Sequence, residues 1–184
     1  MTKEVLFMKL NVVLYNPEIP QNTGNIMRTC VGTNCKLHLI EPLGFKVDSA
    51  TVKRCGVNYL DNLDMMVYPN WDDFVSKNQG TYFFMTRYGH KPPSTINFKD
   101  VEGDIYLIFG KESTGIPYEL LANHLDNCFR LPMTDKVRSL NLSNCVAIVV
   151  YEALRQLDYL DLLREEPESM KGKDFLNQFI TNKE

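Results

Sequence analysis

The feature that most constrains this 184-residue chain is an abrupt change from polar to apolar sequence over residues 131–154, LPMTDKVRSLNLSNCVAIVVYEAL. A helix over residues 145–151 would be apolar on almost every face, so protein must enclose it. The polar stretch before it would then bring hydrogen-bonding side chains to a deeply placed helix N-terminus, whose N–H groups lack intrahelical partners. These side chains are Thr134, Asp135, Arg138, Ser139, Asn141, Ser143 and Asn144. The pattern is typical of a pocket for a polar small molecule, and equally of a core helix capped by Asn141 or Ser143.

Two other segments repeat this design. Residues 16–28, NPEIPQNTGNIMR, and residues 106–117, YLIFGKESTGIP, each combine a strand end or turn-rich loop with the start of a helix. In open α/β sheets, ligands bind at such loops beyond the carboxyl ends of the strands. The three segments together favour a ligand site at one edge of a sheet.

The order of apolar runs predicts an α/β fold, with a single-domain, mostly parallel sheet flanked by helices on both faces. Strands are expected over residues 10–15, 36–40, 65–68, 82–86, 105–109 and 128–133. Helical patterns occupy residues 23–33, 49–59, 71–77, 118–124 and 142–159, and residues 89–104 are expected to form a long connection. A hydrophobic content of 44% gives a chain of this length enough apolar side chains for one core.

Composition argues against several classes of protein. The five cysteines are an odd number without paired metal-ligand spacing, and the three histidines are scattered, so we expect reduced thiols and no metal site. No apolar run approaches membrane-spanning length, and the apolar stretch near the N-terminus is too short for a signal peptide. We therefore expect a cytoplasmic protein that does not enter a membrane.

The net charge of −3 does not exclude a nucleic-acid partner, because the charge is unevenly distributed. The C-terminal residues 158–184 carry seven acids and four bases, whereas residues 77–99 carry four bases and no acid. Phosphates respond to local basic surface within a Debye length. Nucleotide-binding enzymes are less well supported, because no Gly-x-Gly-x-x-Gly or phosphate loop follows the predicted strands.

The three segments, in this order, resemble the motifs of the SPOUT-class RNA 2′-O-ribose methyltransferases, most closely the TrmL type that modifies the wobble nucleotide of tRNA. The resemblance covers about residues 10–156. It implies a methyltransferase domain over residues 8–160, with a C-terminal trefoil knot and a homodimer. It also implies S-adenosylmethionine as methyl donor, no metal, and a tRNA anticodon stem-loop as substrate. Two alternatives are a methyltransferase of another RNA and a non-catalytic RNA-binding module on the same fold.

The resemblance also assigns residues. Cofactor contacts are implied for Met85, Thr86, Gly110, Leu131 and Ser139. The polar residues of the catalytic centre are implied to be Asn22, Arg28, Glu112, Ser139 and Asn141. Without the resemblance, the residue types also allow other roles: Asn22 could cap a helix, and Glu112 could be an exposed turn residue. Ser143 and Asn144 are expected to be structural caps.

Arg28 is implied to act in catalysis, sometimes as a base. A guanidinium is effectively always protonated in proteins, so we expect an electrostatic role instead. It would bind the phosphate beside the target ribose and stabilise the developing 2′-alkoxide. The sequence GKESTG departs from the family pattern around Lys111, Ser113 and Thr114, which puts RNA contacts from that loop in doubt.

The two ends fall outside the resemblance. Residues 1–7 are expected to be an N-terminal extension. Residues 161–184 are expected to form a tail with a short amphipathic helix carrying Phe175, Leu176, Phe179 and Ile180, packed on the body or on a partner subunit. The apolar residues 145–157 and 175–180 would both suit a dimer interface.

Overall fold

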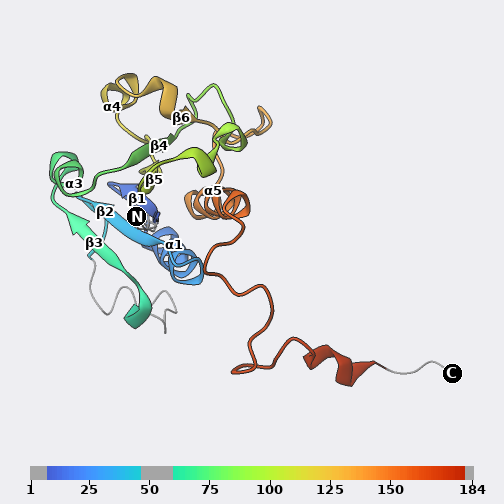
Figure 1. Ribbon diagram of the computed structural model, residues 1–184. Coiled ribbons are helices and arrows are strands. Elements are labelled where there is room, and N and C mark those ends of the chain that lie inside the picture. The colour runs from blue at the N-terminus through green and yellow to red at the C-terminus, as the bar shows by residue number, and fades with distance from the viewer. Residues whose placement is uncertain (1–7, 47–59, 181–184) are drawn as a thin grey trace, which may run out of the picture.

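The computed structural model describes residues 8–46 and 60–180, and within them six parallel strands form one sheet (Figure 1). The strand order is β3-β2-β1-β5-β4-β6. The strands are β1 (Leu10–Tyr15), β2 (Lys36–Ile40), β3 (Met65–Tyr68), β4 (Thr81–Met85), β5 (Ile105–Gly110) and β6 (Cys128–Phe129). Because every pair is parallel, all six carboxyl ends meet at the same edge of the sheet.

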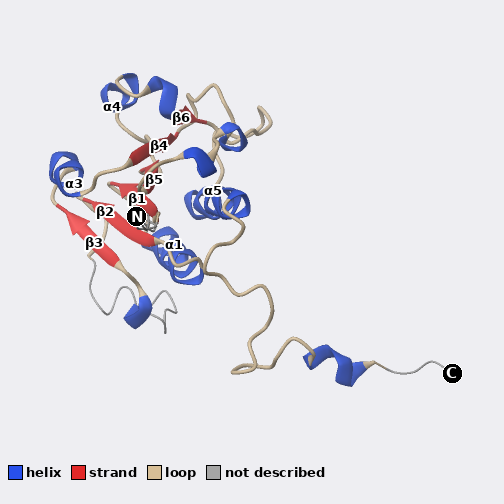
Figure 2. Cartoon of the chain, in the orientation of Figure 1, coloured by secondary structure: helices blue, strands red, loops and turns tan. Residues whose placement is uncertain are grey.

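Helices cover both faces of this sheet (Figure 2). α1 (Pro20–Gly32) and α5 (Leu142–Gln156) pack together on one face, where their apolar residues join one core cluster. α3 (Trp71–Lys77) and α4 (Tyr118–Ala122) lie on the other face and contribute to a second cluster. Central strands buried on both faces explain why β1 and β5 are almost continuously apolar. The predicted α/β architecture is confirmed.

Among the described residues, five further segments are short 3₁₀ helices, namely η1 (Leu60–Asn62), η2 (Pro93–Thr95), η3 (Phe98–Asp100), η4 (Leu125–Asn127) and η5 (Phe175–Phe179). η2 and η3 lie within the long connection expected over residues 89–104. They place Ile96 and Phe98 in the core beside α5. The connection is therefore packed and not a loose loop.

Several predicted boundaries are wrong by a few residues. β6 ends at Phe129 instead of residue 133, because it pairs only with the last residues of β4 and then diverges from the sheet. α1 begins at Pro20, three residues earlier than expected, with proline in the first turn. α5 ends at Gln156, and Asp158 and Tyr159 take left-handed backbone conformations that stop the helix. The helix expected over residues 49–59 lies outside the described residues.

α5 is not enclosed on all sides by its own chain. Val146, Val149 and Val150 are fully buried, but Ile148 and Tyr151 are 46% and 51% exposed. The helix has an inward face toward the sheet and an outward face that still carries large apolar side chains. The tertiary structure of one chain therefore leaves part of the apolar helix facing outward.

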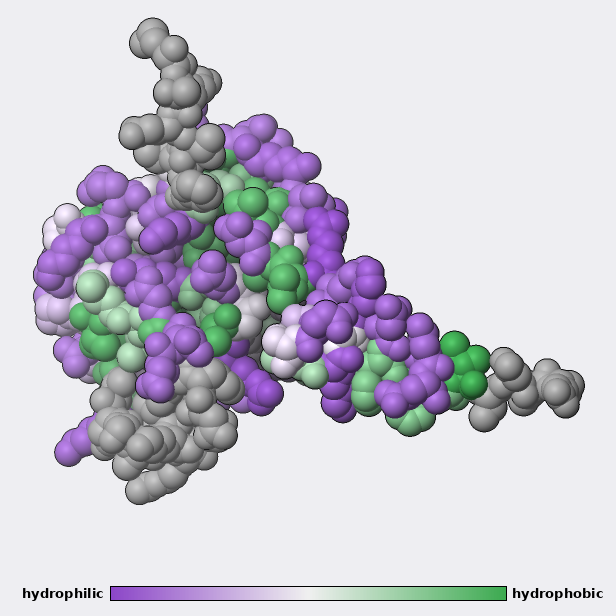
Figure 3. All heavy atoms as spheres, turned by 60° about the horizontal axis from the view of Figure 1, so that its bottom comes forward, coloured by the Kyte–Doolittle hydropathy of each residue, from purple (hydrophilic) through white to green (hydrophobic). Residues whose placement is uncertain are grey.

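The C-terminal tail leads away from the body after α5 (Figure 1). The short helix expected in the tail is the 3₁₀ helix η5, in which Leu176 and Phe179 are 72% and 65% exposed. Figure 3 shows the described end of the tail as an apolar segment apart from the body. The predicted packing on the body is not observed. The domain boundaries and the trefoil knot stay predictions, and residues 1–7 lie outside the described residues.

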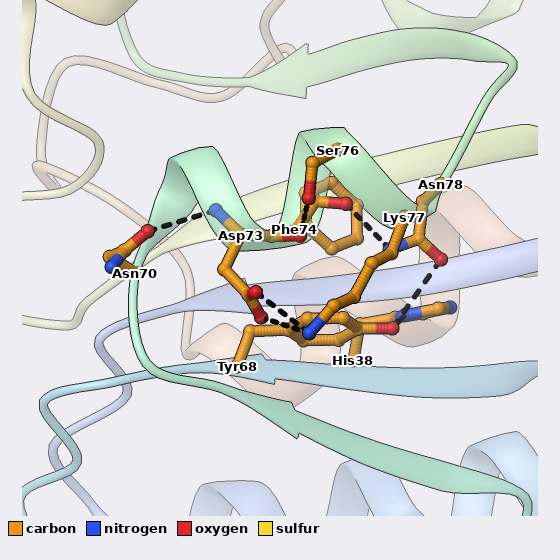
Figure 4. A network of polar contacts seen from close by, with 8 residues as sticks. All are labelled: His38, Tyr68, Asn70, Asp73, Phe74, Ser76, Lys77 and Asn78. Carbon is orange, nitrogen blue, oxygen red and sulfur yellow. Dashed lines mark hydrogen bonds and ion pairs between the residues drawn. The ribbon is translucent and has the colours of Figure 1, made fainter.

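A buried polar network supports the second core cluster, around His38 on β2 (Figure 4). The His38 Nδ1 lies 2.9 Å from the Tyr68 hydroxyl, and its Nε2 lies 3.1 Å from Asn11 Oδ1. The Asn11 Nδ2 donates to the backbone oxygens of Lys9 and Ile105, so its Oδ1 accepts the proton from Nε2. The Tyr68 hydroxyl also lies 3.4 Å from Asn78 Oδ1, and its single proton can go to only one of the two acceptors. In the neutral form of His38, Nε2 donates to Asn11 and Nδ1 accepts from Tyr68.

The pKa of His38 is lowered to about 4, mainly by burial and to a smaller extent by the nearby Lys36, while Asp64 acts in the opposite direction. Between about pH 6.5 and pH 4, an unfolded chain would bind a proton at this histidine while the folded chain would not. Folding stability supplied by neutral His38 is therefore present above pH 6.5 and is lost as the pH falls toward 4.

We expect the unfolding free energy of the natural protein to fall over that window by about 3 kcal/mol more than that of His38→Gln. A glutamine at this position does not titrate between pH 6.5 and pH 4, so the variant is the control for all other pH effects on stability. Urea denaturation at several pH values measures the difference. Parallel pH dependences for the two proteins would contradict the assignment.

Candidate active site

Loops from three strands converge at the carboxyl edge of the sheet. Residues 16–19 connect β1 to α1, residues 111–117 connect β5 to α4, and residues 130–141 connect β6 to α5. These are the three polar segments that the sequence singled out. Since β1 and β5 are neighbours in the sheet, the first two loops start side by side.

Glu112 joins the first two loops. Its Oε2 accepts a hydrogen bond of 2.8 Å from the backbone N–H of Glu18, and its Oε1 accepts one of 3.3 Å from Ile19. The same Oε1 accepts a hydrogen bond of 2.9 Å from the Asn22 side-chain Nδ2. α1 has no side-chain cap from its own N-cap residue and no acid in its first turn. The carboxylate of Glu112 therefore supplies the acceptor and the negative charge that a helix N-terminus favours.

Asn22 extends the connection to the third loop. Its side chain is buried, and its Oδ1 accepts a hydrogen bond of 2.9 Å from Asn141 Nδ2. The Asn141 Oδ1 in turn accepts from the Ser143 backbone N–H at 2.9 Å and from the Ser143 hydroxyl at 2.7 Å. Asn141 is therefore the N-cap of α5, one of the two caps that the sequence allowed. Asn22 lies inside the first turn of α1 and is not its N-cap.

Glu18 is a member of the site that the sequence reasoning missed. Its carboxylate accepts from the Ser113 backbone N–H at 3.0 Å and from the Ser113 hydroxyl at 2.9 Å, and it lies 3.9 Å from Lys111 Nζ. Glu18 and Glu112 thus make reciprocal contacts between the first two loops. An acid in each of two turn-rich loops was the available sequence signal, but only the fold shows that they are neighbours.

Gly110 allows the second loop to fold closely on itself. A Cβ at this position would come within 2.2 Å of the Gly115 carbonyl carbon and the Ile116 nitrogen. Lys111 and Gly115 form an isolated antiparallel bridge, and Gly115 has a φ of +77°. The loop is therefore a tight backbone turn in which a side chain at Gly110 would clash with backbone.

The other residues expected to contact the cofactor border the same edge. Met85 and Leu131 are partly buried against the core cluster that contains α1 and α5. Thr86 follows β4, and its backbone N–H donates to the Phe129 oxygen at 2.8 Å. Ser139 is exposed on the third loop. Arg28 is exposed on α1, within two turns of Asn22.

The backbone of the third loop is open to interaction. Residues 134–139 are all exposed, so their backbone polar groups are accessible to water or to a ligand. The loop lies between the partly buried Leu131 and the cap of α5, so it offers backbone polar groups beside an apolar contact.

Among residues 8–46 and 60–180, no group of three His, Cys, Asp or Glu side chains is placed to hold a metal ion. None of the helices described there is long and apolar enough to cross a membrane.

An open α/β sheet with three ligand-type loops at one edge defines the general class of this protein, and comparison with known proteins identifies the family. Residues 9–151 match the model of the SpoU rRNA Methylase family, so the chain belongs to that family. A Listeria monocytogenes protein provisionally named tRNA (cytidine(34)-2′-O)-methyltransferase is 50% identical over 159 residues, covering 86% of this chain and 94% of that protein.

Two further relatives agree. The Saccharophagus degradans tRNA (cytidine(34)-2′-O)-methyltransferase is 43% identical over 151 residues, which cover 81% of this chain and 96% of that protein. A solved structure described as giving insights into the 2-OH methylation of C/U34 on tRNA is 40% identical and has a TM-score of 0.76. It covers 86% of this chain and 98% of that chain. The resemblance seen in the sequence is confirmed.

Replacing Glu112 by Ala should lower the unfolding free energy by about 1–3 kcal/mol, because three donors at the start of α1 lose their acceptor. Chemical denaturation at neutral pH measures the loss. Glu102→Ala removes an exposed acid before β5 and is the matched control, with an expected change within about 0.5 kcal/mol. Equal stabilities for the two variants would contradict a capping role for Glu112.

Proposed function

We infer that the chain transfers a methyl group from S-adenosylmethionine to the ribose 2′-hydroxyl of nucleotide 34, a cytidine or uridine, in the anticodon loop of tRNA. The observation that carries this conclusion is the match to relatives of that activity over nearly their whole length. The three joined loops place the polar residues of the family motifs at one edge of the sheet.

The described edge fits such a methyl donor. S-adenosylmethionine supplies an electrophilic methyl group on a positively charged sulfur, and it carries no phosphate. The tight turn at Gly110 brings backbone groups to the edge without a side chain between them. Met85 and Leu131 offer apolar contact, and the exposed residues 134–139 offer polar groups. We propose that Met85, Thr86, Gly110, Leu131 and Ser139 hold the donor.

The chain's own contribution to the reaction is alignment and charge. We propose that Arg28 binds the phosphate next to the target ribose and stabilises the 2′-alkoxide as it develops, because its guanidinium stays protonated. The hydroxyl proton passes to that phosphate or to water, and S-adenosylhomocysteine is the leaving group. Asn22, Glu112 and Asn141 are proposed to hold the three loops in register through their mutual hydrogen bonds. Fixed alignment of the ribose oxygen with the methyl group is the main requirement of an in-line displacement.

We also propose that residues 8–160 form the methyltransferase domain of a homodimer. The outward face of α5 supports this assembly, because Ile148 and Tyr151 would otherwise leave large apolar groups in water. The exposed apolar residues of η5 would add to the same interface or to a neighbouring one.

We propose that the protein works in the cytoplasm, where reduced thiols persist. Cys30, Cys35, Cys128 and Cys145 are unpaired. Burial raises the pKa of each of these thiols, to about 11 for Cys35, so they stay protonated at neutral pH.

The activity is tested with an anticodon stem-loop and labelled S-adenosylmethionine. We expect methylation at nucleotide 34 and none when that nucleotide is 2′-deoxy. Arg28→Ala should lose at least about a hundredfold in transfer rate while retaining cofactor affinity, and Arg28→Lys should recover only part, because an ammonium lacks the bidentate fork. Ser139→Ala should instead weaken cofactor binding, as isothermal titration would show.

Arg164→Ala, in the tail, is the control arginine and should behave as the natural protein. Binding of the stem-loop with neither cofactor binding nor transfer would identify a non-catalytic RNA-binding module. A natural transfer rate for Arg28→Ala would remove that residue from the catalytic centre.

The assembly is tested by sedimentation at micromolar concentration, where we expect a dimer. Ile148→Asp should shift the equilibrium toward monomer, because it would bury an unpaired carboxylate in the interface. Leu125→Asp, at a 70% exposed position on η4, is the matched control and should leave the dimer intact. A monomeric natural protein would overturn the proposed interface.

A further inference from the structure

Two exposed tyrosines face each other at the carboxyl edge of the sheet. Tyr88 follows β4 and Tyr118 begins α4, and they are 51% and 60% exposed. Their ring centroids lie 5.5 Å apart at an angle of 86°, and their hydroxyl oxygens are 3.1 Å apart. The pair therefore fixes two large rings relative to each other while leaving much of their surface accessible.

Each tyrosine is attached to a loop of the candidate site. The Tyr88 backbone N–H donates to the Thr86 hydroxyl at 3.3 Å, and Thr86 is a proposed cofactor contact. A Cβ at Gly89 would come within 2.4 Å of the Phe129 backbone, so this turn is held closely against the start of the third loop. Tyr118 directly follows the turn of residues 110–117. The pair thus lies where the loops after β4, β5 and β6 meet.

Positive charge surrounds the pair. The Arg87 guanidinium carbon lies 5.4 Å from the centroid of the Tyr88 ring, and Arg130 Nη1 donates to the Arg87 oxygen at 2.7 Å. The hydrogen bond with Tyr88 raises the pKa of Tyr118, whereas the charges of Arg87 and Arg138 act in the opposite direction. Arg138 is therefore also close to the pair. The acid next to Tyr118 in the sequence is Glu119.

Accessible aromatic rings bordered by arginines are the chemistry that binds unpaired nucleotides. Bases stack on tyrosine rings and guanidinium planes, and arginine also binds phosphate. Tyrosine and arginine are also common in protein interfaces. The position beside the proposed cofactor contacts favours RNA, because the target ribose must reach this edge.

We propose that Tyr88 and Tyr118 form a platform on which an unpaired base flanking the target nucleotide stacks, with Arg87, Arg130 and Arg138 contacting the adjacent phosphates. This inference rests on the proposed function and identifies a substrate-binding surface for it. The tyrosines act on substrate affinity, whereas the polar network of Asn22 and Glu112 holds the catalytic loops.

The experiment compares full-length Tyr88→Ala and Tyr118→Ala with the corresponding Phe variants. The substrate is an anticodon stem-loop carrying fluorescent 2-aminopurine at position 33 or position 35. The natural protein should quench the fluorescence at one of these positions, because stacking quenches this base. Each Ala variant should lose the quenching and raise the KM for the stem-loop about tenfold or more.

The Phe variants lose the contact between hydroxyls but keep both rings, so their KM should stay within about threefold of the natural value. Cofactor affinity and the rate at saturating stem-loop should be nearly unchanged in all four variants. Leu125→Ala, at an exposed apolar position in η4 outside the proposed interface and the tyrosine pair, is the control and should behave as the natural protein.

Suppose that the unmutated protein methylates nucleotide 34 and that both Ala variants show the same quenching and the same KM as that protein. This result would overturn the stacking platform and leave the proposed function intact. The exposed pair would then be better explained as a contact for a protein. A natural protein that methylates no stem-loop would instead overturn the proposed function, and the platform with it.

Discussion

The arrangement of the candidate site depends on the hydrogen bond between Glu112 and Asn22. One carboxylate, carried by the loop after β5, accepts from the backbone at the start of α1 and from a side chain one turn inside it. Through its other end, Asn22 accepts from the cap of α5. Three loops that are distant in sequence are therefore held by two adjacent side chains. Because Asn22 is buried, loss of either partner would leave polar groups without hydrogen bonds in a partly dry environment.

The hydrogen-bonded residues Glu112, Asn22 and Asn141 form a joint between the three loops. This joint divides the edge of the sheet into a fixed part and an open part. The fixed part comprises Glu18, Glu112, Asn22 and Asn141, whose polar side chains are hydrogen-bonded to one another or to the adjacent Ser113 and Ser143. The open part comprises the exposed residues 134–139 and the Tyr88–Tyr118 pair, which present polar groups and aromatic rings outward. A methyltransferase needs both properties, since alignment requires rigid loops and substrates require accessible groups. The described geometry assigns them to different residues.

The two core clusters differ in their relation to the candidate site. The cluster between the sheet and helices α1 and α5 lies directly beneath the joint, and it includes the partly buried Met85 and Leu131. The opposite cluster is built from aromatic rings around His38. His38 is hydrogen-bonded on both nitrogens and does not belong to the site, although a buried histidine is often a functional candidate. Its network instead connects β1, β2 and β3 across one face of the sheet.

The sequence by itself determined the order of strands and helices, because apolar runs of strand length alternate with amphipathic or apolar helices. It also determined the family and most polar residues of the site, since Asn22, Glu112 and Asn141 stand in long motifs. Only the tertiary structure decided how these residues meet. Hydrogen bonds between residues 90 and 119 positions apart leave no periodic trace in a sequence, so Glu18 went unrecognised and Asn22 could be mistaken for a helix cap. For the same reason the outward face of α5 and the pairing of Tyr88 with Tyr118 emerged only from the fold, which sets which side chains are covered and which remain exposed.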